Sequence, residues 1–219
     1  FVITVQAEEP ATVFTTVAAM HTDSNLGDYL EFTGIVISTF DGGYFLSDGT
    51  HAIGVYKGNN DLVVVKGDEV KVRGFYKVYN TLYQIGDVVS DVVLSSGNTN
   101  PLVGNEMVKS VEEMNNLDSS DPLIHGMYYT VTGTVALKGD YNNVVIVDGD
   151  LDIMVYYASD AASIAALEAV VGQEITITVS YYTDHGRDGV LVTYDNGEAG
   201  ITINALPDAE NIAKKLEWL

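Results

Sequence analysis

The chain has 219 residues and a mass of 23.6 kDa, which is enough for one or two domains of ordinary size. Apolar residues make up 47% of the sequence and charged residues 19%, a composition that supports sizeable hydrophobic cores. The formal net charge is −21, from 31 acidic and 10 basic residues, which disfavours general binding to nucleic acids and anionic membranes. The absence of cysteine excludes disulfides, thiolate catalysis and zinc ribbons. No apolar run approaches the ~20 residues that a membrane-spanning helix needs, so we expect no membrane insertion.

The first nine residues predict a strand followed by a linker. Residues 1–6 alternate apolar and polar side chains, as a half-buried strand does. They resemble residues 201–208, where Ile201 and Ile203 alternate in the same way before a proline. We interpret residues 1–9 as the trailing strand and linker of a preceding unit, or as a free edge strand. A free strand needs partners for its backbone groups, so self-association through residues 1–6 is a hypothesis.

Residues 10–97 and 98–205 predict two similar units, each rich in strands. A helical stretch opens each unit, at residues 12–20 and 105–114. The first unit then has β-like runs at residues 29–38, 44–47, 52–57, 69–78 and 81–85, with a trailing run at 88–94. The second has runs at residues 128–137, 143–147, 153–157, 174–182 and 189–194, with a helical insertion at 160–170 between its third and fourth runs. Residues 206–219 predict the start of a following helix, with Asp208 as its N-cap.

An internal repeat relates the two units. Gly34 and Gly133 stand in matching first strands. The second and third strands flank an Asp-Gly pair in both units, and the fourth strand follows a glycine and an acidic residue; these landmarks are Asp48-Gly49, Asp148-Gly149, Gly67-Asp68-Glu69 and Gly172-Gln173-Glu174. The repeat favours an array that is cut at equivalent points over a complete two-domain protein.

Five strands in each unit, with a helix after the third in the second unit, are typical of the OB-fold, a small Greek-key barrel. The series Gly34-Ile-Val, Ser47-Asp48-Gly49-Thr and Gly67-Asp-Glu-Val-Lys-Val-Arg-Gly74 resembles the OB-fold domains found, often repeated, in bacterial secreted nucleases and surface proteins. We therefore expect an all-β protein with short helices: two tandem five-stranded OB-fold-like barrels, each preceded by a short helix. The second unit departs from the pattern at Gln173 and at Val179, where the first has Gly74.

Motifs for catalysis are weak. Asp148-Gly-Asp150-Leu-Asp152 looks like the start of a calcium loop, but Ile153 and Ser159 stand where an EF-hand needs Gly and Glu, and the repeat favours a hairpin turn. His185 lies beside acidic and basic residues in a segment that we interpret as a solvated loop rather than a general-base site. The nucleophile-elbow, phosphate-loop and dinucleotide-binding motifs are absent. We expect no enzyme activity, no cofactor and no metal site.

OB-folds generally bind ligands over their second and third strands and the adjoining loops. In the first unit these regions carry aromatic and basic residues, the combination that single-stranded nucleic acid uses: Phe40, Tyr44, Tyr56, Lys57, Lys77, Tyr79 and Tyr83. The alternative is that about half of these tyrosines cap the barrel or cover the joint between units. Residues 1–105 hold 12 acidic and 5 basic side chains, net −7, whereas residues 106–219 hold 19 and 5, net −14. Any binding of a polyanion is therefore expected in the first unit.

The acidic, tyrosine-rich repeat favours a non-enzymatic segment of a secreted or cell-surface protein that serves in display, adhesion or assembly. We expect a protein or a surface glycan as its partner and no nucleic acid at physiological salt. The first alternative is a nucleic-acid-binding accessory segment of a secreted nuclease, which the family resemblance favours. The second is a carbohydrate-binding module, because stacking on sugar rings needs no positive charge.

Overall fold

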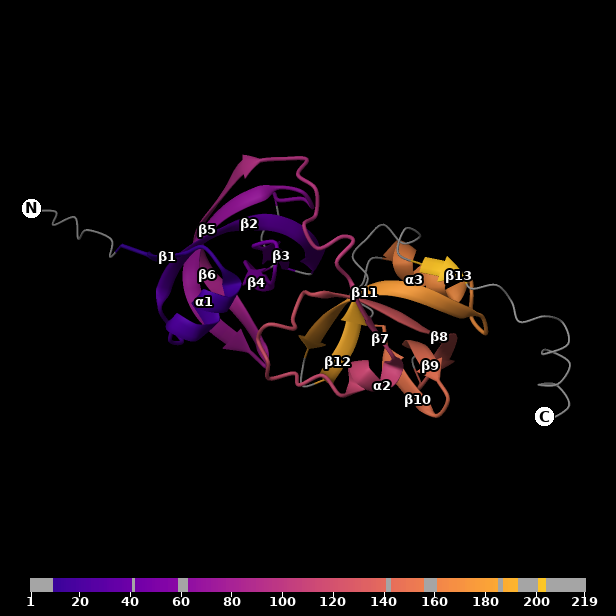
Figure 1. The fold of residues 1–219 in the computed structure, drawn as a ribbon. Helices are drawn as coiled ribbons and strands as arrows, with labels where there is room; N and C mark the ends of the chain where they lie inside the picture. Colours follow the sequence, from indigo (N-terminus) through magenta and orange to yellow (C-terminus); the bar gives the residue numbers. More distant parts are fainter. Residues whose placement is uncertain are drawn as a thin grey trace, which may run out of the picture. The chain divides into compact units, whose positions relative to one another are not determined.

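The computed structural model describes residues 10–40, 42–58, 63–140, 143–155, 161–184, 187–192 and 201–203 (Figure 1). The chain forms two compact units, Phe1–Leu102 and Val103–Leu219, which we call unit 1 and unit 2. The predictions made for residues 1–9, for His185 and for residues 206–219 lie outside the described residues. Among those that are described, no helix has the length and apolar character needed to cross a membrane.

Unit 1 is a closed five-stranded barrel. Its elements in chain order are β1 (Thr12–Phe14), α1 (Val17–Asp23), β2 (Tyr29–Phe40), β3 (Gly43–Ser47), β4 (Ala52–Tyr56), β5 (Glu69–Tyr79) and β6 (Leu82–Ser95). The sheet runs β1-β2-β3-β4-β6-β5, and β5 pairs back to β2, which closes the barrel. The β4–β6 contact is parallel and the other barrel pairings are antiparallel. This topology is that of the OB-fold, as the sequence predicts.

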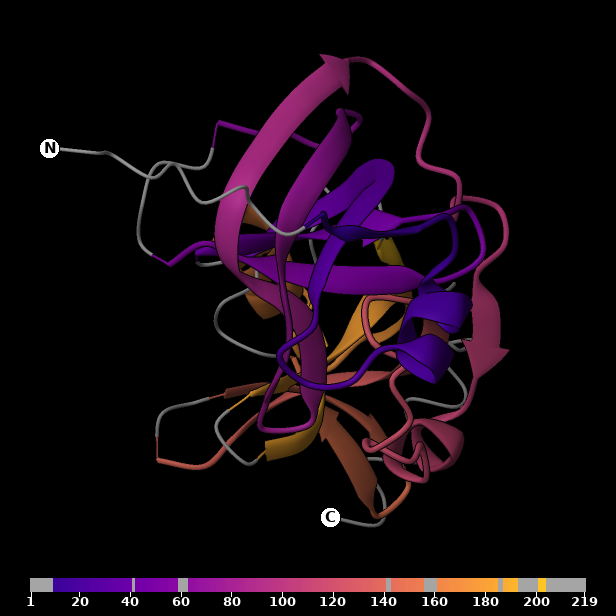
Figure 2. The same cartoon turned by 90° about the vertical axis from the view of Figure 1, so that its left-hand side faces the viewer.

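Buried and more exposed residues alternate along the long strands, so one face of each strand points into the barrel core. In β2 the even-numbered residues from Leu30 to Val36 are buried, and the odd-numbered ones are half-buried. A bulge between Val36 and Ser38 lets β2 bend and pair with β3 beyond its pairing with β5 (Figure 2). The buried rings and aliphatic side chains of these strands fill the barrel: Leu30, Phe32, Tyr44, Phe45, Leu46, Ile53, Val70, Val72 and Ile85.

Unit 2 repeats this plan with one added helix. Its elements are β7 (Met107–Lys109), α2 (Val111–Asn115), β8 (Tyr128–Lys138), β9 (Asn143–Asp148), β10 (Leu151–Met154), α3 (Ala161–Glu168), β11 (Glu174–Asp184), β12 (Arg187–Val192) and β13 (Ile201–Ile203). Its main sheet runs β10-β9-β8-β11-β12, and β10 lies against β12 without a ladder between them in the described part of the chain. The helix α3 stands between the third and fourth barrel strands, where the sequence predicts it.

The prediction of a helix over residues 12–20 and 105–114 is wrong for the first half of each segment. Residues 12–14 and 107–109 form the short strands β1 and β7, which run parallel to β2 and β8. Each helix begins only after a hydroxyl N-cap: the Thr16 side chain accepts a hydrogen bond from Ala19 N, and Ser110 forms a capping box with Glu113. In the first segment Thr12, Val13 and Thr15 favour extended backbone, which explains the difference there.

The last described strand of each unit pairs with the fourth barrel strand, on the side away from the first barrel strand. In unit 1 this strand is the end of β6, where Val93 lies opposite Val70; in unit 2 it is the separate β13, where Ile203 lies opposite Ile175. In unit 1, β6 passes directly over Gly74, where an added Cβ would lie 2.8 Å from Gly86 O. In unit 2 the equivalent position holds a valine, Val179, and lies between the pairings of β11 with β12 and with β13.

Candidate ligand-binding face of unit 1

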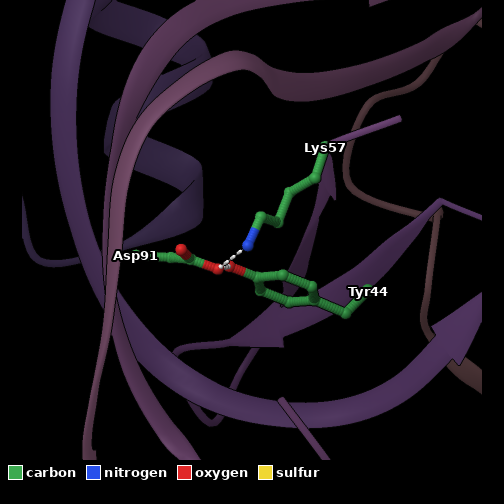
Figure 3. Close-up of polar contacts among 3 residues, drawn as sticks. All are labelled: Tyr44, Lys57 and Asp91. Atoms are coloured by element: carbon green, nitrogen blue, oxygen red, sulfur yellow. Dashed lines mark hydrogen bonds and ion pairs between the residues drawn. The ribbon is translucent and has the colours of Figure 1, made fainter. Parts of the chain in front are cut away.

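Three side chains from distant parts of unit 1 converge beside the barrel strands that bind ligands in OB-folds. Tyr44 comes from β3, Lys57 follows β4, and Asp91 lies on β6 (Figure 3). Lys57 Nζ donates to Asp91 Oδ2 over 2.6 Å, and the Tyr44 hydroxyl donates to the same oxygen over a long 3.5 Å. The three residues therefore connect the second, third and fifth barrel strands through one carboxylate oxygen.

The Tyr44–Lys57–Asp91 cluster is largely shielded from solvent, unlike an ion pair on the surface. The side chains of Lys57 and Asp91 are each only 18% exposed, and Tyr44 is fully buried. Burial, and then the negative charge of Asp91, raises the pKa of the Tyr44 hydroxyl well above its usual range, so it stays a donor. Lys57 has Asp91 as its counter-ion, so a phosphate group would have to compete with a carboxylate for its ammonium.

The turn between β2 and β3 pairs with the end of β4, which carries the exposed Tyr56 ring. Gly42 adopts a φ of +77°, and its carbonyl accepts a hydrogen bond from Lys57 N over 2.8 Å. A Cβ on Gly42 would lie 2.9 Å from the Tyr56 ring, so that ring covers the turn while remaining 41% exposed. Phe40 is buried against Phe45, with 5.2 Å between ring centroids. Four of the seven predicted residues thus gather here: Phe40, Tyr44, Tyr56 and Lys57.

The other three predicted residues, Lys77, Tyr79 and Tyr83, lie on the β5–β6 hairpin. Lys77 pairs with Asp87 on the surface, and Tyr79 is 48% exposed at the end of β5. Tyr83 is half-buried and packs against Tyr76 and the helix residue His21, with ring centroids 5.7 and 5.6 Å apart. The partners of Lys77 and Tyr83 named here, Asp87, Tyr76 and His21, are not members of the Tyr44–Lys57–Asp91 cluster.

Asp91 is the member of this cluster that sequence patterns do not single out. It lies in the run Val88-Val-Ser-Asp-Val-Val-Leu94, which the sequence predicts only as a trailing strand. A single carboxylate inside an apolar strand is the one indication that could have drawn attention to it, because a charge in such a run usually has a partner. Its partner follows β4, 34 residues earlier in the chain, and sequence spacing does not reveal it.

The two Asp-Gly pairs are turns in both units. Asp48 Oδ1 accepts hydrogen bonds from Thr50 N and His51 N, and its Oδ2 accepts one from Val17 N at the start of α1. Asp148 lies opposite Leu151 at the end of the β9–β10 hairpin, with Gly149 at a φ of +59°. The hairpin interpretation of the calcium-like sequence is therefore confirmed. No cluster of His, Asp or Glu suited to a metal ion occurs among the described side chains.

Comparison with known proteins finds only distant structural similarity. No family model and no curated protein matches the sequence. Among solved structures, the hypothetical protein YgiW of Escherichia coli is 17% identical, with a TM-score of 0.32, 40% of this chain covered and 100% of that one. The Stn1–Ten1 complex of Schizosaccharomyces pombe is 19% identical, with a TM-score of 0.34 and coverages of 42% and 83%. A replication protein A heterotrimer bound to ssDNA is 10% identical, with a TM-score of 0.29 and coverages of 95% and 72%.

These neighbours are OB-fold proteins, in agreement with the strand order of unit 1. They also correct one expectation. The prediction that nucleic acid is not a partner at physiological salt is contradicted, because one of the similar structures was solved bound to ssDNA. The net charge behind that prediction describes the whole chain, whereas recognition depends on the local face, and strong net charge does not exclude it.

Proposed function

We propose that the chain is a non-enzymatic tandem OB-fold segment and that unit 1 binds single-stranded nucleic acid on the face around Tyr56 and Lys57. The observation that carries the proposal is the exposed Tyr56 ring at the end of β4, next in sequence to Lys57 of the Tyr44–Lys57–Asp91 cluster, on the strands that OB-folds use for ligands. Nucleic-acid binding thereby takes the place of display or adhesion as the proposed function.

The exposed Tyr56 ring and the Lys57 ammonium suit two parts of a nucleotide. A base stacks on the Tyr56 ring, a contact that is sequence-tolerant and contributes about 1–3 kcal/mol per base in proteins of this type. The neighbouring phosphate pairs with the Lys57 ammonium and replaces Asp91 as its counter-ion. Because that exchange replaces one anion by another, we expect weak binding, with a slope of log K against log salt of about −0.7 for each phosphate contact.

Charge favours unit 1 over unit 2 as the binding unit. Residues 1–105 have a net charge of −7 and residues 106–219 a net charge of −14. In unit 2 the described pair Lys138–Asp152 resembles Lys57–Asp91 in chemistry, but its side chains are 49% and 37% exposed. An exposed pair is screened by water and salt, so its release is expected to matter less.

The test is fluorescence anisotropy of a labelled single-stranded oligonucleotide titrated with wild type, Asp91→Asn and Asp152→Asn. Both variants remove one negative charge and free one lysine, and they differ only in where they do so. We expect Asp91→Asn to tighten binding several-fold, Lys57→Glu to abolish it, and Asp152→Asn to change it little. Equal effects of the two Asn variants would show a non-specific charge effect and refute the proposed face, as would no binding of any variant at low salt.

The setting that we propose is a secreted or cell-surface protein, such as a secreted nuclease with accessory OB-folds. The acidic, cysteine-free composition and the motifs of both units support this setting. Fractionation of cells that produce the protein tests it: recovery from the medium or the surface supports the proposal, and recovery from the cytosol alone contradicts it.

A further inference from the structure

The Asp-Gly turns after the second barrel strand of each unit have equivalent places in the fold but different surroundings. In unit 1 the Asp48 carboxylate accepts hydrogen bonds of 2.7–2.8 Å from three backbone N–H groups, those of Val17, Thr50 and His51. The N–H of Gly49, the next residue, donates to Ser47 Oγ over 3.0 Å. The carboxylate and the neighbouring N–H of this turn are therefore both held by other groups.

In unit 2 the equivalent turn is open to solvent. Asp148 and Gly149 are both exposed at the tip of the β9–β10 hairpin, and a Cβ added to Gly149 would meet no atom within 4 Å. Within the described part of the chain, the Asp148 carboxylate has no backbone donors like the three that hold Asp48. The helix α2 contacts this hairpin elsewhere, through Asn115, whose side-chain amide donates to Asp152 O over 3.1 Å. The Asp148 carboxyl group is thus able to approach the Gly149 N–H.

An aspartate that precedes glycine can rearrange when these two groups meet. The glycine nitrogen attacks Cγ of the neutral carboxylic acid, so an N–Cγ bond forms while the nitrogen proton and the carboxyl OH leave as water. Glycine favours this attack because it has no Cβ and its backbone rotates easily. Water then opens the resulting succinimide. Its addition at Cγ restores aspartate, whereas its addition at the main-chain carbonyl carbon breaks the original peptide bond and leaves isoaspartate, which is linked through Cγ. One water is lost and one is gained, so no other reactant is needed.

We propose that Asp148 is a site of isoaspartate formation and that Asp48 is protected from the same reaction. At Asp48 the reaction requires the carboxylate to leave three N–H donors and the Gly49 N–H to leave its acceptor. At Asp148 it requires neither. The product has one additional methylene group in the main chain, at a position that lies opposite Leu151, so it disrupts the pairing at this end of the β9–β10 hairpin. The site lies in unit 2 and is independent of the proposed nucleic-acid face.

The test is peptide mapping of the full chain by mass spectrometry after prolonged warm incubation at mildly acidic pH, where more of the carboxyl group is in the reactive neutral form. Isoaspartyl and aspartyl peptides have equal masses, but they separate in chromatography and give different fragments on electron transfer. We expect at least about tenfold more isoaspartate at Asp148 than at Asp48, because Asp48 must first lose its hydrogen bonds. Equal amounts at the two residues, or aspartate alone at Asp148, would overturn the proposal.

Two controls separate the folded structure from the local sequence. In concentrated urea the contacts of Asp48 are lost, so we expect isoaspartate to form at similar rates at Asp48 and Asp148. A preference for Asp148 that persists in urea would arise from the neighbouring residues and would refute the structural explanation. The variant Asp148→Glu can form only a larger and more slowly closing imide ring, so the peptide that contains this position is expected to remain unmodified. Isomerisation of that peptide in the variant would assign the reaction to another residue and contradict the proposal.

Discussion

Gly34, in the first barrel strand of unit 1, offers a direct test of how closely the first two strands pack. In unit 1 a Cβ added to Gly34 would lie 2.7 Å from the carbonyl oxygen of Ser47 on β3 and 3.0 Å from the Phe32 ring. Backbone cannot yield as a flexible side chain can, so Gly34→Ala forces β2 and β3 apart. Overpacking of this kind costs about 1–3 kcal/mol. For a unit of this size each kcal/mol lowers the melting temperature by about 4–8 °C.

Gly54→Ala is the matched control, because Gly54 also lies in a barrel strand of unit 1. The nearest atom to its added Cβ is Gln84 Cβ at 3.5 Å, an ordinary contact. Alanine there reduces the entropy of the unfolded chain, so stability is expected to stay equal or to rise by about 0.5–1 kcal/mol. Differential scanning calorimetry measures the melting temperature of each variant. Equal melting temperatures for Gly34→Ala and Gly54→Ala would refute the packing argument.

Three further predictions concern pH and the ends of the helices. Burial holds the pKa of His125 in the folded state below its ordinary 6.5, so the unfolded chain takes up the proton first. The stability of unit 2 is therefore expected to fall as pH decreases below about 6.5, by at most about 1.4 kcal/mol per pH unit. Urea titrations at several pH values measure this slope, which His125→Phe is expected to reduce. Ser110→Ala removes the capping box of α2 and is expected to cost about 1 kcal/mol in the same titrations, a result that an unchanged midpoint would contradict. Asp48→Ala leaves the buried Val17 N–H without its 2.7 Å acceptor and is expected to cost about 1–3 kcal/mol, whereas Asp148→Ala, at an exposed turn, should cost less; equal melting shifts would disprove this difference.

Local patterns in the sequence were sufficient to predict the strands. Alternation in segments such as β5 shows directly which side chains face the core, and the Asp-Gly pairs mark hairpins because a positive φ is easy for glycine. The order of strands around the barrel came from the resemblance to OB-folds, because periodicity says nothing about which strands pair. The β1 and β7 segments were misassigned because three residues are too few for either period to be recognised.

The candidate site could be predicted only in part, because its contacts join distant segments. Residue type and strand position were enough to bring Tyr56 and Lys57 into consideration. They could not show that Asp91 neutralises Lys57, nor that Tyr83 packs on His21 rather than beside Tyr44. Both facts depend on how β6 curves around the barrel, which is set by tertiary packing and not by local propensity.

The central claim is that unit 1 binds single-stranded nucleic acid on the face that includes Tyr56 and Lys57. An oligothymidylate titration of the ¹⁵N-labelled chain at low salt, followed through its amide resonances, tests it most directly. The account predicts progressive shifts at Gly42, Gly43, Tyr56 and Lys57 that diminish as salt is added and vanish in Lys57→Glu. Shifts confined to unit 2, or unchanged resonances at these four residues at saturating oligonucleotide, would contradict it.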